Sequence, residues 1–179
     1  MHIVMAKAFF RLISQLVFGT RRYNNRCIKK FSKGIKNKKI LELGSGKKLR
    51  GEYFYSTKRF FDKSNEFIQT DVNKKFGHKV LDVTKMDYRN KYDVIICMNV
   101  LEHVYDFNKA VSNIYKALKK KGTAVIFVPV FYPLHDEPGD YWRFTEHSLR
   151  KILKNFSNVK IVHSGIRQYP FAYYIETVK

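Results

Sequence analysis

The sequence has few of the residues that cross-link a chain or divide it. Its 179 residues include two cysteines and four prolines. Cys27 and Cys97 stand far apart and match no metal-binding or redox spacing. Because nothing demands an oxidising compartment, the cytoplasm is the expected location. No Pro-rich linker and no internal repeat is present, which excludes a repeat architecture and leaves the length of one ordinary domain.

Acidic residues are scarce as well. Lys and Arg number 35 against 15 Asp and Glu, a formal net charge of +20. One interpretation is a polyanionic partner such as nucleic acid, an anionic membrane surface or a phosphorylated substrate. The other is compositional habit, because the lysines are scattered along a chain rich in Lys, Asn, Ile, Phe and Tyr. Hydrophobic residues at 45% exclude a disordered chain.

The N-terminal segment lacks the features of a spanning helix and of a secretion signal. Residues 2–18 are apolar except for four polar residues that recur on one helical face: Lys7, Arg11, Ser14 and Gln15. Two charges inside the segment argue against a membrane span, and no A-x-A-like cleavage site follows it. We expect a helix that packs on its own domain, with peripheral membrane contact through this segment as the alternative.

Short apolar runs alternate with helical patterns along the rest of the chain. Strands are predicted at 39–43, 66–70, 79–81, 92–98, 123–130, 158–163 and 171–178. Helices are predicted at about 21–34, 107–118 and 145–156. This alternation predicts an α/β fold with a doubly wound, mostly parallel sheet, helices on both faces, and a shortened C-terminal end. The domains would be an N-terminal helical extension over residues 1–36 and one domain over residues 37–179.

Glycines and acids follow the first three predicted strands. Ligands of an open parallel sheet bind outside the carboxyl ends of its strands. Gly44, Ser45 and Gly46 follow the first strand, where glycines let the backbone turn sharply and approach a ligand closely. Asp71 follows the second strand and can accept both hydroxyls of a ribose. Asp82 follows the third strand and is placed to accept from an exocyclic amine.

The glycine turn departs from the dinucleotide-binding fingerprint. Gly44-x-Gly46 lacks the third glycine, and Lys48 stands near its position. A side chain there disfavours a pyrophosphate and tolerates a smaller, cationic ligand. A tight turn without any ligand is the alternative interpretation of these glycines.

Four stretches of the chain resemble one family. They are Ile40–Gly46 (I-L-E-L-G-S-G), Tyr92–Val104 (Y-D-V-I-I-C-M-N-V-L-E-H-V), Ala117–Pro129 and Tyr132–Thr145. In order and spacing they resemble class I, Rossmann-like S-adenosylmethionine-dependent methyltransferases, in the branch often described as type 11. The last stretch resembles a segment of bacterial members often linked to cell-surface glycan or lipid pathways.

The resemblance implies methyl transfer with S-adenosyl-L-methionine as the cofactor. It places the first glycine turn beside the methionine part, Asp71 at the ribose, Asp82 at the adenine and Met98 beside the sulfonium. The implied cofactor-binding residues are Glu42, Gly44, Ser45, Gly46, Asp71, Asp82, Val83, Met98 and Asn99. Acids around a cationic ligand offset its charge, and aligning nucleophile, methyl and sulfur is catalysis by positioning. We expect no metal, because the spacing reveals no cluster of ligands.

Polar residues after the fourth and fifth strands are candidates for the acceptor side of the site. His103, His135 and Asp140 are the candidate catalytic residues, acting as a general base. His135, Tyr141 and Arg143 are the candidate substrate contacts, with Arg143 clamping an anionic group. The alternative is a packed histidine at position 103 and a loop tied by an Asp140–Arg143 ion pair.

Three functions therefore stay open. The leading hypothesis is methyl transfer to a small-molecule, glycan or lipid-linked acceptor, at oxygen. The second is an RNA or protein methyltransferase that uses the basic surface. The third is a non-catalytic, cofactor-binding partner subunit. Neither an Asn/Asp-Pro-Pro-Tyr/Phe motif nor a Pro-Cys pair follows the fourth strand, which disfavours amino-group nucleic-acid and carbon-5 cytosine chemistry.

Overall fold

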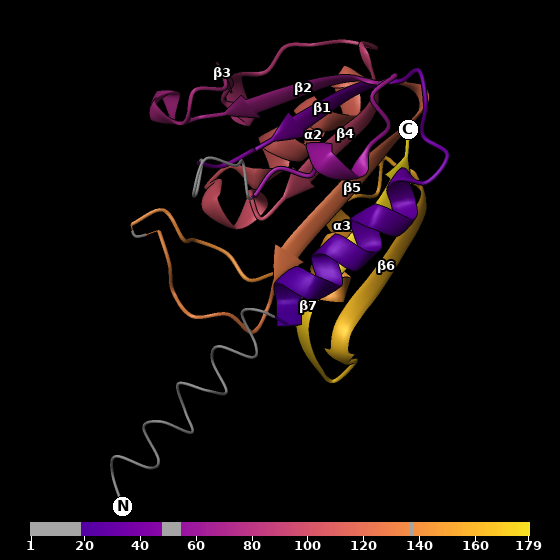
Figure 1. The fold of residues 1–179 in the computed structure, drawn as a ribbon. Coiled ribbons are helices and arrows are strands. Elements are labelled where there is room, and N and C mark those ends of the chain that lie inside the picture. The colour runs from indigo at the N-terminus through magenta and orange to yellow at the C-terminus, as the bar shows by residue number, and fades with distance from the viewer. Residues whose placement is uncertain (1–18, 48–54, 137) are drawn as a thin grey trace, which may run out of the picture.

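A seven-stranded sheet forms the centre of the molecule (Figure 1). The structure is a computed structural model and describes residues 19–47, 55–136 and 138–179. The strands are β1 (Lys39–Leu43), β2 (Glu66–Asp71), β3 (Lys79–Val80), β4 (Tyr92–Met98), β5 (Leu118–Pro129), β6 (Ser157–Ile166) and β7 (Tyr169–Val178). Their order is β3-β2-β1-β4-β5-β7-β6; β7 pairs antiparallel with both β5 and β6, and the other pairs are parallel. The predicted doubly wound, mostly parallel sheet is confirmed.

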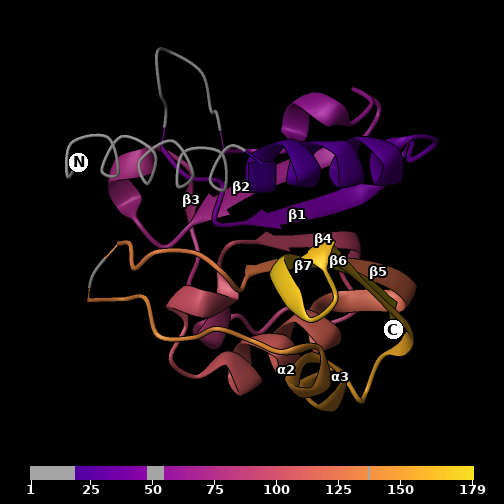
Figure 2. The same ribbon diagram turned by 90° about the horizontal axis from the view of Figure 1, so that it is seen from below.

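Helical segments cover both faces of this sheet. A helix over residues 19–32 lies on one face, and α2 (Phe107–Ala117) and α3 (Glu146–Ile152) lie on the other (Figures 1 and 2). Short 3-10 turns complete the connections: η1 (Lys58–Phe60), η2 (Lys74–Phe76), η3 (Val83–Lys85) and η4 (Leu101–His103). None of the helices in the described part of the chain is long and apolar enough to cross a membrane.

A hydrophobic core lies on each face of the sheet, and strand β4 contributes side chains to both. Successive side chains of a strand point to opposite faces. Val94 and Ile96 pack with Ile28 of the N-terminal helix, whereas Ile95 and Cys97 pack on the α2 side. All four strand residues are buried. A continuous apolar run is therefore what a strand covered on both faces requires.

The helix ends follow the predicted signals. Asp106 caps α2, since its side chain accepts a hydrogen bond from the backbone N–H of Lys109 at 3.0 Å. Thr145 caps α3 through a reciprocal capping box with Ser148. Helix α3 nevertheless ends at Ile152, four residues before the predicted end at Phe156.

Two expectations about strands are wrong. Strand β5 begins at Leu118, directly after α2, rather than at Thr123, because Leu118 already pairs with Tyr92. The C-terminal end is not short of a hairpin: β6 and β7 pair from Ser157 to Ile166. The predicted helix over residues 2–18 lies outside the described residues.

Asp93 fastens the amino end of the central strands. Its Oδ2 accepts the backbone N–H of Lys39 at 2.8 Å, and the Lys119 ammonium donates to both carboxylate oxygens at 2.9 and 3.0 Å. Partial burial alone would raise the pKa of Asp93, but the bonds from Lys39 and Lys119 hold that pKa below its ordinary value. The carboxylate thus joins β1, β4 and β5.

We predict that Asp93→Asn lowers the free energy of unfolding at pH 7 by about 1–3 kcal/mol, because the amide cannot serve both donors. The folded-state pKa is depressed, so the difference from wild type is present above about pH 4, the ordinary value, and disappears as the pH falls through the folded pKa. Urea denaturation at neutral and acidic pH measures it. Glu66→Gln is the control: Glu66 pairs with the Lys39 ammonium at 2.8 Å but is 59% exposed. Its cost should stay below about 1 kcal/mol, and equal losses in the two variants would contradict the assignment.

Candidate functional site

The turn after β1 requires glycine at two positions. Gly44 and Gly46 have left-handed φ values of 66° and 72°. A Cβ on Gly44 would lie 2.5 Å from Cγ2 of Val100, and one on Gly46 would lie 2.8 Å from Cβ of Tyr55. Side chains are excluded by both the dihedral angle and the space, because Val100 and Tyr55 pack directly against the two glycines.

The Glu42 side chain stabilises this turn through hydrogen bonds. Its buried carboxylate accepts hydrogen bonds from the hydroxyls of Ser45 (2.7 Å) and Ser56 (2.6 Å) and from both the N–H and the hydroxyl of Thr57 (2.6 Å each). Two carboxylate oxygens offer about four lone-pair sites. The protein therefore uses the full acceptor capacity of Glu42, and this side chain acts on the site by positioning the turn.

Asp71, at the end of β2, holds the other side of the same turn. Its Oδ2 accepts the backbone N–H of Gly46 and its Oδ1 accepts that of Asn73, both at 2.9 Å. The Ser45 N–H donates to the carbonyl of the preceding residue in β2, Thr70, at 2.9 Å. A ring nitrogen of His78, Nε2, lies 2.9 Å from the Gly46 carbonyl oxygen. Among the described residues, each Asp71 oxygen accepts one hydrogen bond, and a carboxylate oxygen can accept two.

Asp82 and Val83 are fixed between β3 and α2. Asp82 caps η3 by accepting the N–H and the hydroxyl of Thr84 at 2.9 and 2.7 Å. Partial burial raises the pKa of Asp82, but the Thr84 bonds and the Lys85 ammonium outweigh it and lower the pKa. Asn113 of α2 donates to the carbonyls of Val83 and Thr84 at 2.9 and 3.1 Å.

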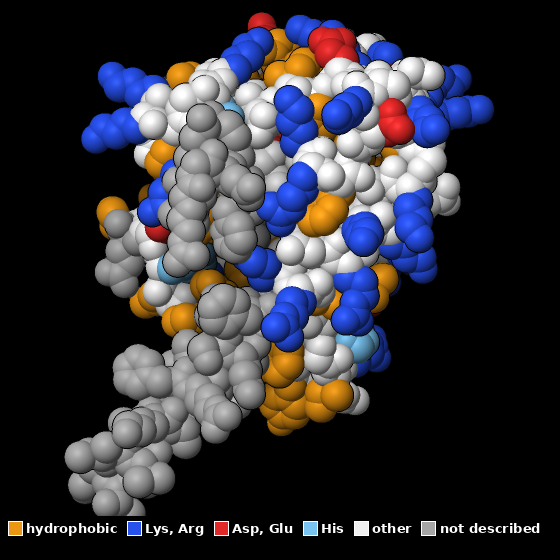
Figure 3. All heavy atoms as spheres, viewed as in Figure 1, with side chains coloured by type: hydrophobic (Ala, Val, Ile, Leu, Met, Phe, Trp, Pro, Cys, Tyr) orange, Lys and Arg blue, Asp and Glu red, His pale blue; other side chains and the backbone are white. Residues whose placement is uncertain are grey.

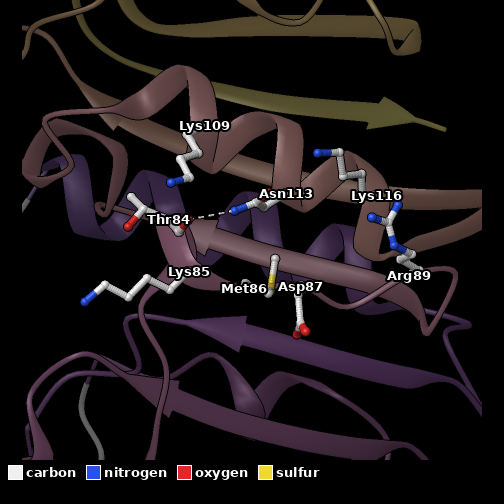
Figure 4. A pocket seen from close by; sticks show the side chains of 8 residues that line it. All are labelled: Thr84, Lys85, Met86, Asp87, Arg89, Lys109, Asn113 and Lys116. Carbon is white, nitrogen blue, oxygen red and sulfur yellow. Dashed lines mark hydrogen bonds between the residues drawn. The ribbon is translucent and has the colours of Figure 1, made fainter.

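The pocket beside Asn113 lies away from the glycine turn. It lies between η3 and α2, with Lys85, Lys109 and Lys116 around it (Figure 4). A second pocket lies between α2 and α3. Neither pocket is lined by the residues of the glycine turn. Strand order and direct contacts are what bring the predicted cofactor residues to one edge of the sheet.

Met98 and Asn99 end the neighbouring strand. Asn99 has a left-handed φ of 52° and donates its N–H to the Phe127 carbonyl at 3.0 Å, which turns the chain away from the sheet. Strand β1 pairs with both β2 and β4, so the chain order reverses at this point. The carboxyl edge at such a reversal is where open α/β sheets bind ligands.

The loop after β5 is tied by an ion pair. Arg143 donates to both Asp140 oxygens at 2.6 and 2.7 Å, and the Asp140 side chain is 1% exposed. These bonds, with the N–H of His135, lower the pKa of Asp140 to about 2. A carboxylate of that pKa is a poor general base at neutral pH. The guanidinium is likewise engaged, whereas Tyr141 is 47% exposed.

A second cluster gathers at the start of this loop. One potential metal-ligand atom from each of Glu102, His103 and His135 lies within 4.8 Å of the other two. Glu102 is fully buried, and burial raises its pKa to about 8. The spacing of residues in the sequence does not reveal this cluster. Glu102 and His103 belong to η4, whereas His135 lies in the loop after β5, far along the chain.

Comparison with known proteins agrees with this geometry. A sequence family described as a methyltransferase domain matches residues 19–160. The chain belongs to this methyltransferase family. The match begins in the helix over residues 19–32, inside the N-terminal extension predicted from the sequence, and the boundary at residue 36 stays a prediction.

The chain spans about a quarter of the length of the curated relatives that it matches. The ubiquinone biosynthesis O-methyltransferase of Rickettsia bellii is 33% identical over 57 residues, covering 32% of this chain and 24% of the relative. Magnesium protoporphyrin IX methyltransferase from Synechocystis superposes with a TM-score of 0.69 at 14% identity, covering 93% and 87% of the two chains. A SAM-dependent methyltransferase from Archaeoglobus fulgidus gives 0.64 at 18% identity, covering 96% and 100%. The fold is that of class I, Rossmann-like methyltransferases; the type 11 branch stays a prediction.

The structure brings the predicted cofactor residues of the methyltransferase together to different degrees. Hydrogen bonds join Ser45 to Glu42 and Thr70, and Gly46 to Asp71. Gly44 faces Val100 beyond β4. The strand order places four further residues at the same edge of the sheet: Asp82, Val83, Met98 and Asn99.

We predict that Glu42→Ala lowers the free energy of unfolding of the methyltransferase by about 2–4 kcal/mol, since a buried donor left without an acceptor costs about 1–3 kcal/mol. Glu42→Gln should cost less, because the serine hydroxyls can turn and accept from the amide. Chemical denaturation gives both values. Gln69→Ala, which removes a donor to Ser56 at 2.9 Å from the same cluster, is the control. A Glu42→Ala loss no greater than that of the control would show that Glu42 does not organise the turn.

Proposed function

We propose that the chain transfers a methyl group from S-adenosyl-L-methionine to an oxygen atom of a small-molecule, glycan or lipid-linked acceptor. The observation that carries the proposal is the glycine turn clamped by Asp71 where the chain order of the sheet reverses. Methyl transfer itself follows from the family. The choice of oxygen is supported by the partial similarity to a ubiquinone biosynthesis O-methyltransferase.

The residues at the strand ends fit this cofactor. Glycines at 44 and 46 allow the tight, left-handed turn at the end of β1, next to which the methionine part would lie. Each Asp71 oxygen accepts one hydrogen bond from the described residues, and a carboxylate oxygen can accept a second, here from a ribose hydroxyl. Oδ2 of Asp82 lies 3.7 Å from the Lys85 ammonium, and an amine of the cofactor would compete with that ammonium. When bound, the sulfonium supplies a methyl group already activated by positive charge. The negative side chains at this edge offset that charge.

The loop after β5, where we place the acceptor, carries exposed apolar side chains. Large exposed hydrophobic side chains gather on and beside the loop after β5: Tyr105 (73% exposed), Phe131 (61%), Leu134 (71%) and Tyr141 (47%). The rings of Tyr105 and Tyr141 pack edge to face, 5.5 Å apart. Exposed apolar groups close together favour binding of an apolar partner. This composition supports an acceptor with an apolar or lipid portion.

His103 and His135 are the proposed groups that act on the acceptor's proton. Their rings lie 4.8 Å apart, edge to face, at the carboxyl ends of adjacent strands β4 and β5. A neutral imidazole carries a lone pair on one ring nitrogen, so it can accept a proton from the acceptor and pass it on. Asp140 is a positioning residue in this proposal, because Arg143 and the His135 N–H occupy its oxygens.

We predict that the purified chain binds S-adenosyl-L-homocysteine with a low-micromolar dissociation constant, about −8 kcal/mol. Asp71→Asn should weaken this binding by about 1–3 kcal/mol, because the amide presents donors to ribose hydroxyls. Isothermal titration calorimetry measures both. Glu66→Gln, at the opposite end of the same strand, should leave the affinity unchanged. Absence of binding to the wild-type chain would overturn the proposed function, whereas unchanged affinity in Asp71→Asn would place the ribose elsewhere.

A further inference from the structure

The carboxylate of Glu102 is buried in an unusual state. The side chain is fully inaccessible, and no other described residue hydrogen-bonds either of its oxygens. Buried polar groups are nearly always paired, because an unpaired one costs several kilocalories per mole in a nonpolar environment. The Arg143 guanidinium is the nearby positive group, but Asp140 neutralises it through two hydrogen bonds. The carboxylate therefore has unused acceptor capacity in the protein interior.

The two neighbouring imidazoles are oriented through their Nδ1 atoms. Nδ1 of His103 lies 2.9 Å from the carbonyl oxygen of Gly139. Nδ1 of His135 lies 3.1 Å from the carbonyl oxygen of Pro133 and 3.1 Å from Oδ2 of Asp140. All three neighbours are acceptors, so each Nδ1 carries a proton and donates it. In a neutral imidazole the lone pair then resides on Nε2.

This arrangement is the usual surround of a metal-binding histidine. Such histidines donate their second ring nitrogen to a backbone carbonyl or a carboxylate, which fixes the ring and raises its basicity. Here the carbonyls of Gly139 and Pro133 and the carboxylate of Asp140 occupy those outer positions. One ligand atom each of Glu102, His103 and His135 lies within 4.8 Å of the others. With metal–ligand bonds of about 2.0–2.2 Å, the ligand atoms would have to approach to about 3–3.5 Å, so binding of an ion would draw the three side chains closer together.

We infer that Glu102, His103 and His135 form a binding site for one divalent transition-metal ion, of which Zn²⁺ is representative. Two imidazoles and one carboxylate suit zinc and its first-row neighbours better than Mg²⁺ or Ca²⁺, which prefer all-oxygen sites. Three protein ligands leave at least one coordination position open, as in catalytic rather than structural zinc sites. The expectation from sequence spacing that the chain binds no metal is replaced by this inference.

The site deepens the proposed function, on which this step rests. The cluster lies after β4 and β5, at the edge of the sheet that also carries Asn99. A cation there would coordinate a hydroxyl oxygen of the acceptor and lower the pKa of that hydroxyl. The acceptor class would accordingly be a hydroxyl compound, and the two histidines would act on its proton through the cation that they hold.

The test is metal binding by the full-length, tag-free chain. The protein is stripped with a chelator, exchanged into metal-free buffer and titrated with Zn²⁺ by calorimetry, with metal content checked by mass spectrometry. Wild type should bind one equivalent, and Mg²⁺ should bind more weakly. His135→Ala should weaken Zn²⁺ binding by at least the roughly 10–100-fold that loss of an outer-shell partner alone produces. Glu102→Gln should weaken it similarly.

A matched control separates this site from surface histidines. His147 is exposed on α3 and lies outside the cluster, so His147→Ala should bind Zn²⁺ as wild type does. Because His135 belongs to a loop, His135→Ala should fold even if Glu102→Gln does not. Zn²⁺ should raise the melting temperature of wild type and His147→Ala but not that of His135→Ala, since a ligand stabilises only the state that binds it.

Binding of S-adenosyl-L-homocysteine to the same metal-free samples distinguishes the two proposals. Cofactor binding without any Zn²⁺ uptake by wild type would overturn the metal site and leave the proposed function standing. Zn²⁺ uptake without cofactor binding would overturn the function and leave the site. Equal Zn²⁺ affinity in wild type and His135→Ala would overturn the assignment of ligands.

Discussion

The carboxylate of Asp71 and its hydrogen bond to the Gly46 N–H connect the sheet to everything built on it. Two neighbouring strands reach the same edge, and each contributes an acid that fixes the turn between them: Glu42 from β1 and Asp71 from β2. A glycine turn alone has many accessible conformations. The two acids hold the turn in the observed conformation, which fixes the Asp71 oxygens relative to the backbone of the turn.

Glu42 and Glu102 show opposite uses of a buried glutamate. Glu42 receives four hydrogen bonds and serves the architecture of the turn. Glu102 receives none from other described residues, and burial raises its pKa to about 8. Stability alone favours the first arrangement and penalises the second. An unpaired acid kept beside two oriented imidazoles therefore points to a ligand, where the satisfied acid points to structure.

The sequence predicted the sheet because short, continuous apolar runs such as Val94–Cys97, bounded by turn residues, are typical of strands buried on both faces. It missed the early start of β5, since Lys119–Lys121 resemble the basic last turn of a helix, yet Leu118 already pairs with Tyr92. Site residues at the ends of strands were predictable from chain order. The role of Glu42 could not be predicted, because its partners Ser56 and Thr57 approach it only in the folded chain. For the same reason the sequence did not predict that His135 lies beside Glu102.

The loop after β5 and the turn η4 are joined by the backbone of Glu102. Its carbonyl accepts the N–H groups of Tyr141 and Trp142 at 2.8 and 3.2 Å. The carbonyl of Gly139 meets His103, while Asp140 holds the N–H of His135 at 3.1 Å. A movement of this loop would therefore alter the contacts that orient His103 and His135. Tyr141, which is 47% exposed, lies on the same loop, so under the proposed function an acceptor that contacts Tyr141 would act on the segment that also orients both histidines.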